Sequence, residues 1–157
     1  MDKTTFINAL IDSRAQWDAL MSQIDEKSML VPGVEGKWSI KDIIAHVMWC
    51  ELEMVPLMQT RILAGSELWN LPQDEGNEAI YQQYRNHPLH EILAQEQEAY
   101  AQVLAAAKTL SDEELNDPHR FKDMPGDWIP WKILAGNSFT HYLDHINSIR
   151  TWLAQRL

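Results

Sequence analysis

The sequence predicts an all-helical protein folded as a four-helix bundle, and three observations lead to this expectation. Four long segments repeat apolar residues at spacings of three, four and seven, the period of a helix with one buried face. Connectors rich in proline, glycine, asparagine and aspartate separate them, and no segment shows the alternation typical of a strand. With 157 residues, 45% hydrophobic and 23% charged, the chain matches one globular domain over residues 1–157.

The first two long helices are expected over residues 5–24 and 40–64, on either side of a connector that contains Pro32, Gly33 and Gly36. Ser39 and Asp42 form a capping-box pattern, in which the hydroxyl accepts from a backbone N–H of the first turn, so the second helix should begin at Ile40. Pro56 is expected to kink or split this helix, and Gly65 to close it.

The second half of the chain is expected to hold one short helix and two long ones. The short helix covers residues 77–86 and is an extra element between the second and third long helices, because Pro88 ends it. The third long helix covers residues 89–110. The last begins near Pro130, a residue favoured in a first turn, and continues to about residue 155. Residues 111–126 should form the longest irregular connector.

The charge balance argues against several classes of partner. Thirteen basic residues against twenty-three acidic ones give a net charge of -10, which repels a phosphate backbone and an anionic membrane surface. The chain shows no signal-peptide pattern at its start and no apolar run of about 20 residues. We therefore expect a cytoplasmic protein that binds neither nucleic acid nor membrane.

The single cysteine, Cys50, excludes an internal disulfide and any zinc site built from several cysteines. Its neighbours Met48 and Trp49 are apolar, which favours a buried small hydrophobic residue. The alternative is a reactive thiol.

His141 and His145 are four residues apart in the last helix. A helical turn is 3.6 residues, so both rings lie on one face at adjacent heights, where they can share a metal ion. The alternative is that each ring only hydrogen-bonds a backbone carbonyl or Asp144. A zincin-type protease is excluded because that motif needs a glutamate directly after the first histidine, where this chain has Tyr142.

A catalytic metal usually takes three protein ligands, so the pair needs a third ligand from another helix. His46 lies in the middle of the second helix, on the face that carries Trp49 and Glu53 and roughly opposite the main apolar arc. Periodicity therefore leaves open whether His46 is buried near the pair or exposed to solvent. The other histidines flank prolines or helix ends.

Two motifs carry a resemblance to a known family. The Trp-Ser-x-Lys-Asp run at 38–42 and the Gly-Asn-x-x-x-His-Tyr-x-x-His run at 136–145 resemble those of the ClbS/DfsB family, within the DinB/YfiT-like superfamily of four-helix bundles. The resemblance covers about residues 7–153. It implies one divalent ion, most often zinc or nickel, held by His46, His141 and His145. It also implies the activities of the superfamily, among them thiol transfer, isomerisation and metal-dependent hydrolysis.

Several further residues are candidates for a site around such a metal. Glu53 is a candidate general base and Asn137 a candidate partner of a ligand, with ordinary surface polarity as the alternative for both. Four tryptophans are candidates for an apolar substrate-binding wall or, alternatively, for core packing: Trp38, Trp49, Trp128 and Trp131.

The leading hypothesis is a metal-dependent enzyme, of hydrolase or thiol-transferase type, that acts on a small electrophilic or toxic molecule. A second hypothesis is a protein that sequesters a reactive compound and gives self-resistance without turnover. A third is a dimerisation scaffold, since amphipathic bundles often pair as homodimers.

Overall fold

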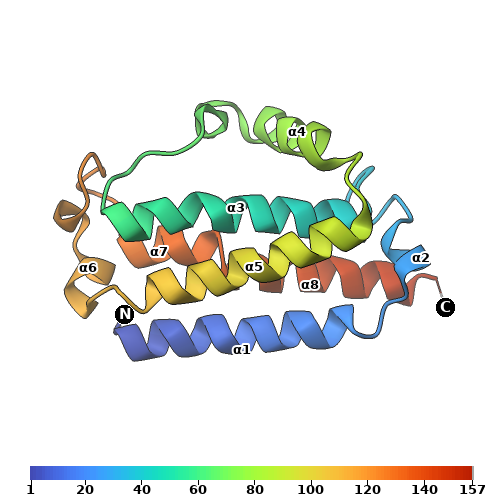
Figure 1. Cartoon of the computed structure of the whole chain (residues 1–157), viewed down its shortest axis with the longest axis horizontal. Coiled ribbons are helices and arrows are strands. Elements are labelled where there is room, and N and C mark those ends of the chain that lie inside the picture. Colours follow the sequence, from blue (N-terminus) through green and yellow to red (C-terminus); the bar gives the residue numbers. More distant parts are fainter. Residues whose placement is uncertain (157) are drawn as a thin grey trace.

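Four long helices lie side by side along the longest dimension of the molecule, as Figure 1 shows for the computed structural model. The structure describes residues 1–156. The long helices are α1 (Lys3–Met21), α3 (Ile40–Thr60), α5 (Leu89–Ala107) and α8 (Phe139–Ala154). Among the described residues the only β-type pairings are two isolated bridges. The prediction of an all-helical four-helix bundle is confirmed.

The starts of the first two long helices follow the local sequence closely. Asp2 precedes α1, and its carboxylate accepts a hydrogen bond from the Thr5 backbone N–H at 2.8 Å. Ser39 and Asp42 form the predicted capping box, with the Ser39 N–H donating to the Asp42 carboxylate at 2.9 Å. These bonds satisfy amide groups that the first turn of a helix leaves without partners.

The end of α3 differs from the prediction. The helix ends at Thr60 rather than near residue 64, and Pro56 lies inside it without splitting it. Arg61 follows the last residue of α3 and has φ 55°, the left-handed conformation that glycine usually adopts at the end of a helix. Its guanidinium forms a salt bridge to Glu114 at 2.7 Å and donates to the Thr109 carbonyl at 3.0 Å. These tertiary contacts hold Arg61 in that conformation, so Gly65 is not needed to stop the helix.

The helix α3 is buried on nearly all sides. Residues 61–88 fold back over its outer face and bring η1 (Glu67–Asn70) and α4 (Gln73–Tyr84) against it (Figure 1). Trp49 and Cys50 pack there against Ile80. The sequence predicted α4 as the extra helix, with slightly different bounds. Because a second layer covers α3, residues opposite its main apolar arc are also buried.

The predicted last helix is two helices, α7 (Pro130–Gly136) and α8. The break falls at Asn137 and Ser138, and the prediction of one continuous helix over 130–155 is wrong at this point. The reason is local competition for the carbonyls of α7. The Asn137 amide donates to the Ile133 carbonyl at 3.0 Å, the Ser138 hydroxyl to that of Leu134 at 2.6 Å, and the Thr140 hydroxyl to that of Ala135 at 2.8 Å.

The remaining elements are short and lie in the predicted connectors. They are α2 (Glu26–Met29), α6 (Asp112–Asn116) and η2 (Pro118–Arg120), so residues 111–126 are less irregular than expected. No helix in the described part of the chain is both long and apolar enough to cross a membrane.

Candidate metal centre

The three histidines that the sequence singled out lie together between α3 and α8. The Nε2 atom of His141 is 3.1 Å from that of His46 and 2.9 Å from that of His145. His46 and His145 are both 8% exposed, and His141 is partly exposed. The sequence left open whether His46 is buried near the pair or exposed to solvent, and in the structure it is buried near the pair.

Two of these rings are neutral at pH 7. Burial lowers the pKa of His46 to about 4, and repulsion from His145 adds to this effect while Glu35 opposes it. Burial lowers the pKa of His141 to about 3, with further repulsion from His145 and His46. Desolvation disfavours the charged imidazolium, so their lone pairs are available to a cation without loss of a proton.

Glu35 fixes the orientation of His145. The Nδ1 atom of His145 is 2.8 Å from Oε1 of Glu35. Burial acts to raise the pKa of Glu35, but this hydrogen bond and the charge of His145 keep it below the ordinary value. A metal ion requires the neutral form of His145, and a neutral ring that donates from Nδ1 to Glu35 carries its lone pair on Nε2, the atom that faces His141. A carboxylate behind a histidine is the usual partner arrangement at protein metal sites.

Glu35 was not among the predicted site residues, because it lies in the connector expected before the second long helix. Its carbonyl accepts from the Trp38 N–H at 2.9 Å, and Gly36 supplies a positive φ of 56° in the tight turn between them. This turn brings the carboxylate to α8 although 110 residues separate Glu35 from His145. Helical periodicity carries no information on such a contact.

The donor set fits a divalent cation. Zinc–nitrogen bonds of about 2.0–2.1 Å place tetrahedral ligand nitrogens about 3.3 Å apart, close to the two contacts here. The Nδ1 atoms of His46 and His141 are buried and have no hydrogen-bond partner within residues 1–156. The Nε2 atom of His141 meets Nε2 of both His46 and His145, and a neutral ring has only one N–H, so proton sharing through this one atom cannot satisfy both contacts. A cation can accept all three lone pairs.

Cys50 lies beside the same cluster. Its Sγ is 4.0 Å from Nε2 of His46, and ligand atoms of His46, Cys50 and His141 all lie within 4.8 Å of one another. Burial raises the pKa of the Cys50 thiol to about 12, and two nearby carboxylates contribute. Cys50 is buried, as expected, but it faces the histidines. The four-residue spacing between His46 and Cys50 places both side chains on one face of α3, and this spacing could have predicted their proximity.

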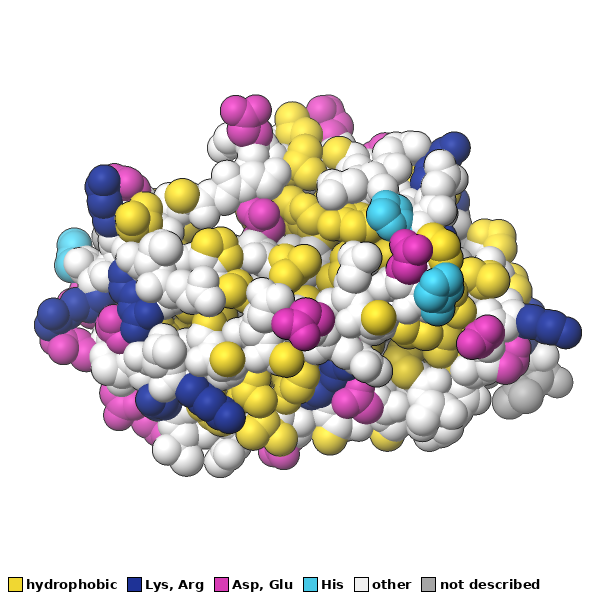
Figure 2. Space-filling model, in the orientation of Figure 1, with side chains coloured by type: hydrophobic (Ala, Val, Ile, Leu, Met, Phe, Trp, Pro, Cys, Tyr) yellow, Lys and Arg dark blue, Asp and Glu magenta, His cyan; other side chains and the backbone are white. Residues whose placement is uncertain are grey.

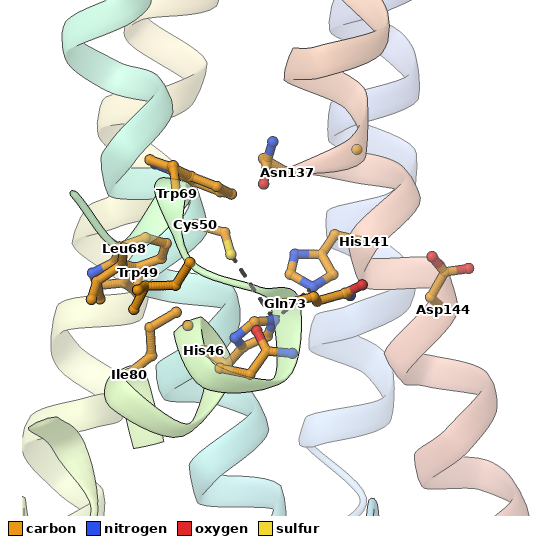
Figure 3. Close-up of a pocket in the computed structure, with 14 residues that line it drawn as sticks. His46, Trp49, Cys50, Leu68, Trp69, Gln73, Ile80, Asn137, His141 and Asp144 are labelled. Carbon is orange, nitrogen blue, oxygen red and sulfur yellow. Dashed lines mark hydrogen bonds between the residues drawn. The ribbon is translucent and has the colours of Figure 1, made fainter. Parts of the chain in front are cut away.

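A cavity of about 410 Å³ opens on this centre. Figure 3 shows an aromatic and aliphatic wall on one side and, on the other, polar residues from α8 and from the break before it. The first wall comprises Trp49, Leu68, Trp69 and Ile80, and the second Asn137, His141 and Asp144. The Trp49 and Trp69 rings are 5.1 Å apart. Cavities of this size and mixed lining commonly bind small molecules.

The other predicted site residues are distributed unevenly around this cavity. Asn137 and Trp49 line it, and the Trp38 ring packs 5.1 Å from that of His46. Trp131 is not among its lining residues and packs against the core. The Glu53 carboxylate accepts from the Trp69 indole at 2.9 Å and from the Ser66 N–H at 2.7 Å, so it braces the segment that covers α3.

A buried polar network crosses the core beneath the histidines. Arg14 on α1 forms a two-pronged salt bridge to Glu96 on α5. Tyr142, the residue after His141, donates its hydroxyl to Glu51, the residue after Cys50. Burial raises the pKa of Glu51 to about 8, and its side chain is 0% exposed. The Tyr142–Glu51 hydrogen bond therefore joins α8 to α3 directly beside His141 and Cys50.

The fold and the site together define a class of protein: a four-helix bundle with a histidine cluster between its second and last long helices. The family model of the DinB superfamily matches residues 9–149, and the chain belongs to that superfamily. No curated protein matches the sequence.

Three solved structures have the same fold. DfsB, described as a sibling lethal factor precursor, is 17% identical with a TM-score of 0.80, and the match covers 99% of this chain and 97% of that one. The colibactin self-resistance protein ClbS, solved in complex with double-stranded DNA, is 15% identical with a TM-score of 0.78, covering 98% and 96%. A Streptococcus pneumoniae protein is 20% identical with a TM-score of 0.80, covering 98% and 91%. The resemblance to the ClbS/DfsB fold is confirmed.

The exclusion of nucleic acid as a partner was wrong. ClbS, which shares this fold, is bound to double-stranded DNA in its structure. Net charge sums the whole surface, whereas DNA contacts depend on where cationic and hydrogen-bonding groups lie. Figure 2 shows several Lys and Arg side chains at the end of the molecule near α6, although the net charge is -10. The total charge therefore does not decide this class of partner.

Proposed function

We propose that this protein is a metal-dependent enzyme, of hydrolase or thiol-transferase type, that acts on a small molecule bound in the cavity of Figure 3. The ligands of the ion, zinc or nickel, are His46, His141 and His145. The observation that carries the proposal is the approach of the three Nε2 atoms, with contacts of 3.1 and 2.9 Å, at the edge of an accessible cavity. Three histidines leave a coordination position for a substrate or water.

The hydrogen bond from His145 to Glu35 favours His145 over Cys50 as the third ligand. It keeps the proton on Nδ1 and the lone pair on Nε2, and it strengthens the ring as a donor. Cys50, by contrast, is a buried thiol whose pKa is raised, so it would have to lose a proton to bind. Cys50 remains the ligand that the variants below must test.

A bound divalent ion would supply Lewis-acid chemistry and lower the pKa of a water or thiol, which makes a nucleophile at neutral pH. The residues of the chain provide the remaining parts. The Trp49 and Trp69 rings present an apolar wall that excludes water from one side of a ligand. The Asn137 amide nitrogen is bonded to the Ile133 carbonyl, so Asn137 presents its amide oxygen on the opposite side and orients the ligand. We assign Glu53 to bracing Trp69 rather than to proton transfer, because its carboxylate is already engaged.

Elemental analysis of protein purified without added metal tests the metal site. We expect about one zinc or nickel ion per chain, retained in Cys50→Ser and lost in His141→Ala and His145→Ala. His90→Ala is the matched control, since His90 is exposed on α5. Loss of metal in Cys50→Ser but not in His145→Ala would assign the third position to Cys50. Metal-free wild-type protein would refute the metal-dependent function.

Binding without turnover is the second candidate, and the aromatic wall of the cavity favours it, as does the self-resistance role stated for ClbS. Incubation of the protein with reactive small molecules separates the two. A sequestering protein shows a higher melting temperature with each bound compound and no new product. An enzyme forms product, and His141→Ala abolishes that formation.

A further inference from the structure

A second cavity, of about 670 Å³, lies next to the one over the histidines. It is lined by the C-terminal half of α3, by residues within the segment 63–70, by Trp128 and by Ile133 of α7. Trp69 and Asn137 line both cavities. Figure 3 shows both side chains at the same end of the histidine cavity, so the second cavity adjoins the first at that end.

The lining of the second cavity is largely apolar. Its aliphatic and aromatic members are Met54, Leu57, Leu63, Ala64, Trp69, Trp128 and Ile133. Glu53 is the only charged residue among those that line it, and its carboxylate is held by Trp69 and Ser66. Trp69 and Trp128 are 46% and 38% exposed, so two large aromatic rings border the cavity in contact with solvent. The free energy falls when an uncharged apolar group covers such a surface and removes it from water.

The segment 63–70, which carries Trp69, is tightly packed where the two cavities adjoin. At Gly65 an added Cβ would lie 2.9 Å from the Glu53 carboxylate and 3.0 Å from the Trp69 ring. Glycine therefore lets Trp69 pack against the backbone while Glu53 holds its indole N–H. These contacts keep Trp69 at the boundary between the cavities.

We propose that the substrate is an elongated small molecule, with a polar reacting end at the histidine centre and an uncharged apolar tail in the second cavity. This proposal rests on the proposed function. Trp69 and Asn137 border the passage between head and tail, and Ile133 and Trp128 select for the tail. The two cavities share Trp69 and Asn137 as walls, and their linings differ: mixed polar and apolar beside the histidines, largely apolar beyond Trp69. This difference assigns the two ends of the ligand.

Alkyl hydroxamates of increasing length provide a direct test, because the hydroxamate head chelates zinc and the tail is an uncharged chain. Dissociation constants for acetohydroxamate and octanohydroxamate are measured by calorimetry on zinc-loaded protein. Each methylene that becomes buried should tighten binding about fourfold, and burial of two or three of the added methylenes already gives about 30-fold, so we expect octanohydroxamate to bind at least about 30-fold more tightly. Ile133→Asn should remove most of this gain and leave acetohydroxamate binding unchanged. Ile11→Asn, at an exposed position on α1, is the matched control.

The outcomes separate the two proposals. Normal acetohydroxamate binding with no gain from the longer chain contradicts the tail site and leaves the metal centre standing. A gain that survives Ile133→Asn, or that Ile11→Asn abolishes equally, also contradicts the tail site. Absence of acetohydroxamate binding to zinc-loaded protein contradicts the proposed function and the tail site with it. Circular dichroism of each variant shows whether the bundle is intact.

Discussion

Acidification should destabilise the metal-free protein through its buried histidines. In the folded chain the pKa of His46 is about 4 and that of His141 about 3, against 6.5 for an ordinary histidine. Below pH 6.5 the unfolded chain therefore binds protons that the folded chain does not, and stability falls as the pH falls. The contribution of the two neutral rings to the free energy of unfolding is fully present above pH 6.5. It decreases down to about pH 4 for His46 and about pH 3 for His141, where the folded rings also bind protons.

The size of the effect follows from these values. Each pH unit below 6.5 costs about 1.4 kcal/mol for each ring that stays neutral, so the step from pH 7 to pH 5 costs about 2 kcal/mol for each ring. The end point of pH 5 lies above the folded pKa of both rings. The magnitude therefore depends on the unfolded pKa and hardly on the folded values. A loss of this size is a large part of the typical 5–15 kcal/mol stability of a domain.

Urea unfolding in the presence of a chelator, at pH 7 and at pH 5, measures the effect. The His141→Gln variant should lose about 2 kcal/mol less than the wild type over this interval. Carboxylates also titrate on acidification, but their contribution to the change in stability is the same in both proteins and cancels in the comparison. His90→Gln, at an exposed position, controls for the loss of a histidine as such. Equal pH dependence in the wild type and in His141→Gln would refute the assignment of a buried neutral ring.

Two further predictions concern residues that support the centre. Glu35→Gln removes the negative charge behind His145 and should weaken metal binding about 10- to 100-fold. Competition with a chelator measures this affinity. Unchanged affinity would mean that Glu35 does not support a ligand. Tyr142→Phe leaves the fully buried Glu51 without its donor and should cost about 1–3 kcal/mol of unfolding free energy in urea. A Tyr142→Phe variant as stable as the wild type would show that Glu51 finds another partner or is protonated without cost.

The sequence by itself determined the features that depend on neighbours along the chain. The helical period located the four long helices and the extra helix, and the Ser39–Asp42 capping box marked the start of α3. The four-residue spacing placed His141 and His145 on one face of α8, because that arrangement needs only the geometry of a single helix. Residue motifs identified the superfamily and, through it, nominated His46.

Only the tertiary structure decided which of these faces meet. Whether His46 faces solvent or α8 depends on how α3 packs against α8 and α4, which no helical period reveals. Glu35 reaches His145 across 110 residues, and Asn137 enters the cavity because side chains end α7 before α8 begins. Such contacts join residues far apart in the chain, and their free energy comes from burial and hydrogen bonds that form only when the helices pack. The centre is therefore a property of the packed bundle, whereas its histidine pair is a property of one helix.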